Sequence, residues 1–226
     1  MADKGRPRLT YFAGRGLAEV IRLALNAAQI EYEDIYMRTR EEFLQLIKDG
    51  KLMFKQVPLL EMDGKNLIGS ESTFRYVCKK GGFMGKTDDD QAMVEMLCLG
   101  ARDMLRSGFS NFQFVAPDKQ EETLQKALKL SRERYLPVFE KTLEESKSGF
   151  LVGDSLTMAD FTFYDPLSYI NEIPRVKHEL DAFPKCKAYI EHFSSQPGLK
   201  EYLASPRRHP PPDAAYVKEV NLVLNW

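Results

Sequence analysis

Cysteine and histidine are the residue types best able to bind metal or attack a substrate, but their spacing here favours neither role. Each type occurs three times, at widely separated positions: Cys78, Cys98, Cys186, His178, His192 and His209. An odd number of cysteines without a C-x-x-C pair predicts neither a disulfide framework nor a zinc cluster. The histidines lack metal-ligand spacing, so we interpret them as surface or packing residues and predict no metal site.

A glycine-rich turn is the most suggestive short motif. Gly14 and Gly16 flank Arg15 directly after a β-prone segment, residues 8–12. The three-glycine fingerprint of dinucleotide sites is incomplete, so a nucleotide site is weakly supported. The chain also contains no H-E-x-x-H, G-x-S-x-G or Walker-type motif.

The composition fits a globular protein rather than a nucleic-acid or membrane binder. The 226 residues are 43% hydrophobic and 29% charged, and 32 basic against 33 acidic residues give a net charge of −1. A near-neutral total disfavours a dedicated binder of nucleic acid or anionic membranes, and a local basic patch is the alternative. No apolar run is long enough to span a bilayer, and the first residues carry no apolar signal segment. We therefore expect a cytoplasmic protein.

The first eighty residues predict alternating strands and helices, in the order β-α-β-α-β-β-α. Strands are expected at 8–12, 30–37, 57–62 and 66–68, and helices at 17–28, 40–47 and 70–81. Three local signals support this order: a Thr39–Glu42 capping box, an Asp63–Gly64 hairpin turn and Ser70 as a helix cap.

After Gly85 the pattern becomes entirely helical. Asp88, Asp118 and Thr157 each resemble a helix start, and a proline-rich stretch at 206–212 precedes a last helix from Asp213. We therefore predict two domains: an α/β domain over residues 1–84 and an all-helical domain over residues 85–226.

Three sequence blocks follow the order and spacing of one known family. They are YFAGRGLAEVIR at 11–22; QVPLL at 56–60, followed by Asp63, Gly64 and Ser70; and FLVGD at 150–154, running into TMAD at 157–160. In these blocks the chain resembles the cytosolic glutathione transferases. Residues 18–22 are sigma-like, whereas residues 52–58, 134–140 and the C-terminal segment are alpha-like.

The resemblance implies a thioredoxin-like domain, a helical domain, a homodimer and a role in detoxification. The family adds the thiol of glutathione, a co-substrate, to small apolar electrophiles. Because only the thiolate is strongly nucleophilic and a free thiol has a pKa near 8.5, the enzyme must stabilise the anion. Tyr11 matches the family's catalytic hydroxyl, which donates to the sulfur. An ordinary packing tyrosine is the alternative.

The family's glutathione-binding positions fall on residues spread over both predicted domains. They are Tyr11, Lys48, Gln56, Val57, Pro58, Ser70 and Asp103. Pro58 matches a cis-proline, and the Val57 backbone would pair with the cysteinyl part of the peptide. Ser70 at a helix N-terminus would bind the γ-glutamyl carboxylate. Asp103 would reach across the dimer to the γ-glutamyl ammonium; a solvated helix charge is its alternative.

Two positions depart from the family pattern and predict weaker glutathione binding. Gly69 stands where a glutamine usually precedes Ser70, and Ile47 stands where alpha-class relatives have a basic residue, with Lys48 adjacent. Each lost charge-assisted contact costs about 1.5–3 kcal/mol. The alpha-class arginine near the sulfur falls on Leu17.

The electrophile would lie beside the sulfur, under a lid formed by the last helix. Alignment gives this pocket Phe12, Arg106, Phe109, Phe112, Val217, Val220, Leu224 and Trp226. For the aromatic residues of the middle group, core packing is an equal alternative. Phe54 resembles the aromatic residue that inserts into the partner subunit, so we assign it to the dimer contact.

Other functions use the same features. The chain could be a weakly active family member serving as a ligand-binding or crystallin-like protein, which Gly69 and Ile47 favour. It could also be a glutathione-dependent steroid or prostanoid isomerase. A thiol-disulfide oxidoreductase is disfavoured, because no cysteine lies at the Tyr11 turn.

Overall fold

The computed structural model describes residues 5–225, which begin with a four-stranded mixed sheet. Strands β1 (Arg8–Tyr11) and β2 (Glu33–Tyr36) are parallel. Strand β3 (Leu59–Met62) pairs antiparallel with both β1 and β4 (Lys65–Ile68), which gives the order β2-β1-β3-β4. The predicted hairpin turn is confirmed, since Asp63 and Gly64 both have positive φ, 54° and 71°.

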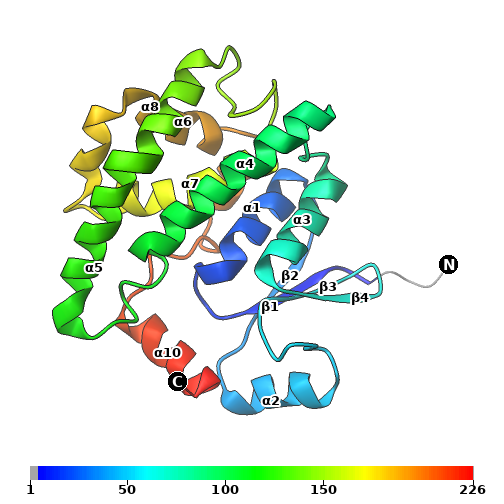
Figure 1. Cartoon of the computed structure of the whole chain (residues 1–226). Helices are drawn as coiled ribbons and strands as arrows, with labels where there is room; N and C mark the ends of the chain where they lie inside the picture. Colours follow the sequence, from blue (N-terminus) through cyan, green and yellow to red (C-terminus); the bar gives the residue numbers. More distant parts are fainter. Residues whose placement is uncertain (1–4, 226) are drawn as a thin grey trace.

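Three helices accompany the sheet in the predicted order. They are α1 (Glu19–Ala27), α2 (Arg40–Lys48) and α3 (Ser70–Gly81). Helices α1 and α3 pack against each other, whereas α2 lies apart from them, next to the C-terminal helix α10 (Figure 1). The capping box at α2 is confirmed, because Thr39 N–H donates to Glu42 at 2.9 Å and Glu42 N–H to Thr39 Oγ1 at 3.3 Å.

The rest of the described chain is helical. Its helices are α4 (Asp88–Met104), α5 (Pro117–Leu130), α6 (Leu136–Glu145), α7 (Met158–Glu172), α8 (Pro184–Ser194), α9 (Leu199–Leu203) and α10 (Ala214–Leu224). Among residues 5–225, no helix is long and apolar enough to cross a membrane. The exact division at residues 84 and 85 stays a prediction; it lies in the connection between α3 and α4.

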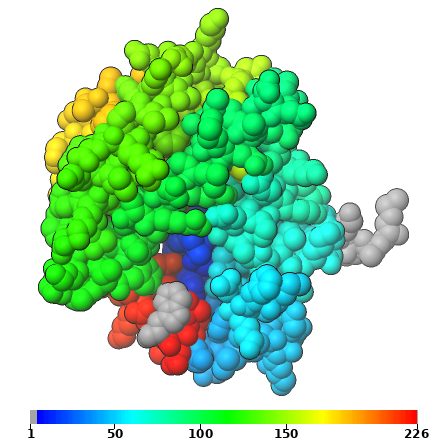
Figure 2. Space-filling model, viewed as in Figure 1, coloured from blue at the N-terminus to red at the C-terminus, as the bar shows by residue number. Residues whose placement is uncertain are grey.

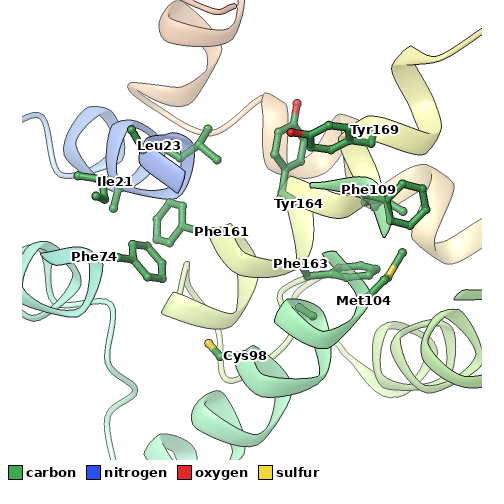
Figure 3. Close-up of a cluster of buried hydrophobic side chains, with 14 of the residues drawn as sticks. Ile21, Leu23, Phe74, Cys98, Met104, Phe109, Phe161, Phe163, Tyr164 and Tyr169 are labelled. Carbon is green, nitrogen blue, oxygen red and sulfur yellow. The ribbon is translucent and has the colours of Figure 1, made fainter. Parts of the chain in front are cut away.

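Helix α7 forms the centre of the core and joins the helical part to the sheet part. It is buried along nearly its whole length, with Phe161 lying toward α1 and α3 and Phe163 toward α4 (Figure 3). The Phe161 ring lies 6.2 Å from that of Phe74 on α3 and 5.0 Å from that of Phe83. Edge-to-face pairs of this kind add to the free energy gained by burying the rings, so the two parts share one apolar core.

Several helix starts differ from the predicted ones. Ser70 is the first residue of α3 and does not cap it; the preceding Gly69, with φ of 79°, is the N-cap. Helix α4 is capped by Thr87, whose Oγ1 accepts from Asp90 N–H at 3.0 Å, instead of by Asp88. Helix α5 starts at Pro117, one residue before the expected Asp118. The starts at Thr157 and Asp213 are confirmed.

A network of buried ions fixes the turn between β1 and α1. Arg22, fully buried, pairs with Asp34 at 2.8 Å and donates to the Gly14 carbonyl at 2.6 Å. Arg15, 1% exposed, pairs with Glu172 of α7 and donates to the His209 carbonyl at 2.6 Å. The turn is therefore held to the sheet by one guanidinium and to the helical part by the other.

Asp165 is a buried acid near this network whose carboxyl group is not fully hydrogen-bonded within the described chain. It is 3% exposed, and its Oδ1 has no hydrogen-bond partner within the described chain. Burial and the nearby Glu19 raise its pKa to about 7, against the lowering effect of Arg208 and Arg15. The folded state therefore favours the protonated acid, so the folded protein loses stability as the pH rises from about 4 to about 7.

We predict that Asp165→Asn stabilises the protein at pH 8 but not at pH 4. The neutral amide removes the cost of ionising a buried acid, which at full extent is about 4 kcal/mol for a shift of about three pKa units. Denaturant unfolding between pH 4 and pH 8 measures the difference.

Asp160→Asn is the matched control for this prediction. Asp160 is equally buried, but its carboxylate accepts from Leu151 and Thr157 N–H at 3.0 and 2.7 Å and from the Tyr189 hydroxyl at 2.9 Å. Its loss should destabilise the protein at every pH. A stability gain for Asp165→Asn that does not change with pH would contradict the assignment.

Candidate functional site

The predicted site residues meet at one edge of the sheet because of the strand register. Thr10 of β1 pairs with Leu59 of β3, and Leu59 pairs with Ile68 of β4. One step beyond this row lie Tyr11, Pro58 and Gly69, which three separate segments contribute. The register thus assembles residues 47 and 58 positions apart in the sequence. The Val57–Pro58 bond is cis, as the resemblance implied.

Tyr11 lies at the end of β1 and is positioned by the following turn. The side chain is 6% exposed, and its hydroxyl oxygen accepts a hydrogen bond from Leu17 N–H at 3.1 Å. Burial raises the pKa of Tyr11, against the lowering effect of the bonds from Leu17 and Tyr216. The phenol therefore stays protonated at neutral pH, with its own O–H available to donate to an anion.

A second tyrosine hydroxyl lies beside the first. Tyr216 of α10 forms a side-chain hydrogen bond with Tyr11, and its ring meets Phe12 edge-on at 6.4 Å. A Cβ at Gly16 would lie 2.6 Å from the Tyr11 oxygen and 2.7 Å from the Tyr216 oxygen, and one at Gly14 would overlap the Tyr216 ring. The glycines of the turn therefore leave room for the two hydroxyls.

Ser70 lines a cavity of about 60 Å³ that continues from the Tyr11 turn. The wall includes Gly16 and Leu17 of the turn, Glu71 of α3, Arg102 of α4 and Arg106 of the π-helical turn that follows α4. Within residues 5–225 the Ser70 hydroxyl has no hydrogen-bond partner. Ser70, at the N-terminal end of a twelve-residue helix, is therefore free to bind an anionic group here.

Other predicted glutathione-binding residues stand outside this cavity. Gln56, Lys48 and Asp103 are all exposed, and none of them lines it. Lys48 ends α2, and Asp103 lies near the end of α4. No contact within the described chain joins any of these three to Tyr11 or Ser70.

The predicted electrophile pocket divides into two groups in the structure. Phe12, Phe109 and Phe112 are each at most 2% exposed, and Phe109 packs against Tyr169 of α7, so Phe109 follows the alternative of core packing. On α10, Val217 and Leu224 are half-buried and Val220 is buried. Trp226 lies outside the described residues.

Arg106 belongs with Ser70 and not with the aromatic group. Its guanidinium pairs with Glu71 at 2.6 Å, and both residues line the cavity that Ser70 lines. The molecular surface is hollowed near this region, where the blue N-terminal segment is visible between α4, α3 and the red C-terminal helix (Figure 2). The hollow therefore exposes part of the N-terminal segment on this face of the molecule.

Three residues near the site were missed by sequence reasoning: Arg15, Arg102 and Tyr216. Arg15 stood in a recognised motif but had no predicted partner, because Glu172 lies 157 positions away. Tyr216 lies in the predicted last helix, and no local sequence pattern indicates that its hydroxyl reaches Tyr11.

Comparisons with known proteins agree with this geometry. Two family models match: "Glutathione S-transferase, N-terminal domain" over residues 7–79 and "Glutathione S-transferase, C-terminal domain" over residues 102–206. Glutathione S-transferase alpha-4 of Rattus norvegicus is 36% identical over 98% of this chain and 99% of its own.

Solved structures support the same conclusion. The glutathione S-transferase from Ascaris lumbricoides has a TM-score of 0.78 and 31% identity, covering 92% of this chain and all of its own. Monomeric Na-GST-3 from the hookworm Necator americanus has a TM-score of 0.77 and 35% identity, covering 88% of this chain and 96% of its own.

The predicted resemblance and the predicted fold, a small mixed sheet with a helical C-terminal part, are both confirmed. Whole-length relatives at about this identity also support the predicted enzyme class. The chain therefore belongs to the glutathione S-transferase family and is a transferase enzyme.

Proposed function

We propose that the protein conjugates the glutathione thiolate to small apolar electrophiles, with Tyr11 as the catalytic hydroxyl. The carrying observation is the buried Tyr11 hydroxyl, which accepts from Leu17 N–H at 3.1 Å and lies at the sheet edge that Pro58 and Gly69 share. A thiolate bound there would accept a hydrogen bond from the Tyr11 O–H. This bond stabilises the anion more than the thiol. Each unit by which the bound thiol's pKa falls requires about 1.4 kcal/mol of differential stabilisation.

We propose that glutathione lies along this edge as an added strand. The Val57 backbone would pair with the cysteinyl residue, Gln56 would approach the same peptide and Ser70 would bind the γ-glutamyl carboxylate. Lys48, exposed at the end of α2, would approach the glycyl carboxylate. Residues 1–84 would then be the glutathione-binding domain and residues 85–226 the helical domain.

We propose that the electrophile binds between Phe12 and the last helix. The rings of Phe12 and Phe114 meet the Tyr216 ring at 6.4 and 6.2 Å, which gives an apolar wall beside the Tyr11 hydroxyl. Half-buried Val217 and Leu224 lie on the same helix. An apolar substrate would gain about 25 cal/mol for each Å² of surface buried there.

We also propose a cytoplasmic homodimer. Large apolar side chains are exposed on the loop before β3 and on α4: Met53 (79%), Phe54 (71%), Met96 (59%) and Leu99 (60%). Exposed apolar groups concentrated on one segment and one helix are typical of an interface. Asp103, exposed on α4, would reach the partner's glutathione from this face.

We predict that Tyr11→Phe lowers the rate of conjugation roughly ten- to hundredfold without unfolding the protein. The ring still packs, and only one charge-assisted bond to the sulfur is lost. The pKa of the bound thiol, read from thiolate absorbance, should rise toward its free value. Retention on immobilised glutathione and turnover of an aromatic electrophile test the function itself.

Tyr36→Phe is the matched control for Tyr11. Tyr36 pairs with Tyr11 in the register of β1 and β2, but its hydroxyl donates a hydrogen bond to the Asp34 carboxylate at 3.4 Å. Its removal should leave the thiol pKa unchanged. If Tyr11→Phe leaves that pKa unchanged as well, another group activates the thiol, and the nearby Thr10 is the first to test.

We predict a dimer of about 52 kDa, twice the 26.0 kDa chain, that Phe54→Ala weakens by about tenfold or more. Because Phe54 is 71% exposed within one chain, its loss should not destabilise the chain itself. Sedimentation at several concentrations measures both species. Val138→Ala, which removes an equally apolar side chain 54% exposed on α6, should leave the dimer intact. A monomeric wild type at micromolar concentration rules out the proposed dimer.

We predict that Gly69→Gln destabilises the protein and does not tighten glutathione binding. The amide would restore the family's side chain, but φ of 79° is strained for any residue with a Cβ, and that Cβ would lie 3.1 Å from Ser72 Oγ. The cost is on the order of 1 kcal/mol or more. Thermal unfolding and calorimetry measure the two effects.

Gly69→Ala separates backbone strain from the amide contact. It introduces the same Cβ without the hydrogen-bonding group, so both variants should lose similar stability. Tighter glutathione binding by the glutamine variant alone would show that the missing side chain limits the site.

A further inference from the structure

The segment between α9 and α10 has few backbone hydrogen bonds to hold it in place. We call residues 204–213 the strap; it contains Pro206 and three consecutive prolines at 210–212. Proline has no N–H to donate, and within residues 5–225 no hydrogen bond between backbone groups involves residues 209–212. Side chains must therefore fix the strap. Because consecutive prolines form a stiff, extended segment, a shift of the strap at residue 209 is passed on to α10.

Two arginine side chains attach the strap to the rest of the chain. Arg15, in the turn after β1, donates from Nε to the His209 carbonyl at 2.6 Å. Arg208 belongs to the strap itself and pairs with Glu19 of α1 at 3.0 Å. Further contacts join the strap and α10 to residues 32–40, and these include Arg207 with Tyr32, His209 with Tyr36, Arg38 with Glu219, and Arg40 with the Val223 carbonyl.

Glu172, the last residue of α7, joins the two arginines. Its Oε2 pairs with Arg15 and its Oε1 with Arg208 at 3.3 Å, so each carboxylate oxygen serves one guanidinium. The Ser168 hydroxyl, one turn earlier on α7, lies 3.3 Å from Arg15 and 3.4 Å from Arg208. One helix therefore holds a guanidinium of the turn against a guanidinium of the strap. We call Glu172, Arg15 and Arg208 the clip.

The negative charge of Glu172 makes this arrangement possible. Arg15 and Arg208 are only 1% and 7% exposed, so water screens little of the repulsion between them. Among the described residues, Glu172 is the only ion-pair partner of Arg15. A carboxylate in the last turn of a helix is unfavourable next to the helix dipole, and the two arginines offset that effect. Without the carboxylate, the turn and the strap would repel each other.

We propose that Glu172 is a positioning residue for the electrophile site, an inference that rests on the proposed place of the electrophile between Phe12 and α10. Its charge keeps the strap on the turn and thereby keeps α10 closed over the Tyr11 hydroxyl. Glu172 acts through the two arginines of the clip and does not touch the substrate itself. An electrophile that binds only the closed arrangement is bound more weakly as the closed fraction falls.

Glu172→Gln, which keeps the shape of the side chain but removes its charge, tests the proposal in the full chain. The KM for chlorodinitrobenzene should rise about tenfold or more, and the rate at saturating electrophile should change less than KM does. The affinity for glutathione should change less than about twofold, because Val57 and Ser70 are positioned by β3 and α3.

Hydrogen exchange of the ligand-free protein gives a second measurement that needs no catalysis. In Glu172→Gln the amides of α10 should exchange at least several-fold faster than in the wild type, whereas those of α5 and α6 should stay protected. A variant that is merely destabilised would instead exchange faster in all helices. The pattern of exchange therefore separates a positioning role from a general loss of stability.

A double-mutant cycle shows whether Glu172 acts through Arg208. Arg208→Gln should also raise KM, because the strap loses its pair with Glu19. In the double variant Arg15 no longer faces a second guanidinium, so KM should rise by less than the product of the two single effects. Effects that simply multiply would contradict the clip.

Glu179→Gln is the matched control. Glu179 is 13% exposed and pairs with Arg132 at 2.6 Å, but it lies outside the clip. This variant should leave KM and the exchange of α10 unchanged. If Glu172→Gln does not fold, Glu172→Asp takes its place; it keeps the charge on a shorter side chain and should raise KM by a smaller factor.

The possible outcomes are distinguishable. A folded Glu172→Gln variant with unchanged KM and unchanged α10 exchange would overturn the proposal, and so would equal losses for glutathione and the electrophile. A wild type that binds glutathione but conjugates no electrophile would instead contradict the proposed function, and the exchange of α10 would still decide the role of Glu172. A raised KM with faster exchange confined to the strap and α10 supports the proposal.

Discussion

The site depends on keeping two arginines charged and buried at the turn between β1 and α1. Burial lowers the pKa of Arg22, but Asp34 and Glu19 more than offset that effect, so the net shift is upward. Burying an ion costs several kcal/mol unless its partners are well placed, and here carboxylates and carbonyls supply them. Replacing Glu172 would leave the buried Arg15 guanidinium without an ion-pair partner among the described residues. The network is therefore as much a constraint as a source of stability.

This constraint determines where the Tyr11 hydroxyl points. Arg22 holds the Gly14 carbonyl and Arg15 holds the His209 carbonyl, so the turn has little freedom. The turn delivers Leu17 N–H to the Tyr11 oxygen at 3.1 Å and thereby occupies one of its lone pairs. The phenol O–H is then left to donate elsewhere. Because Arg15 also holds the segment leading to α10, the same ion network positions the helix that carries Tyr216.

Much of the fold could be predicted from the sequence, whereas the hydrogen bonds and ion pairs of the site could not. Hydrophobic periodicity and local motifs such as Thr39–Glu42 and Asp63–Gly64 act over a few residues, and they predicted the element order of the first eighty residues correctly. The predicted N-cap of α3, Ser70, was one residue off, because only the backbone φ reveals that Gly69 is the N-cap. The partners of Arg15 and Arg102 lie on other elements, and no local pattern encodes such pairs.

The two sets of arginines near the site differ in what their surroundings leave available. Arg15 and Arg22 are almost fully buried, and their donors are used by carboxylates and carbonyls of the chain itself. Arg102 and Arg106 border a cavity and share one carboxylate, that of Glu71. A guanidinium with all its partners inside the fold can only hold structure, whereas one with spare donors at a cavity can bind an anion. Both sets lie next to the Gly16–Leu17 turn, and they do not share a carboxylate.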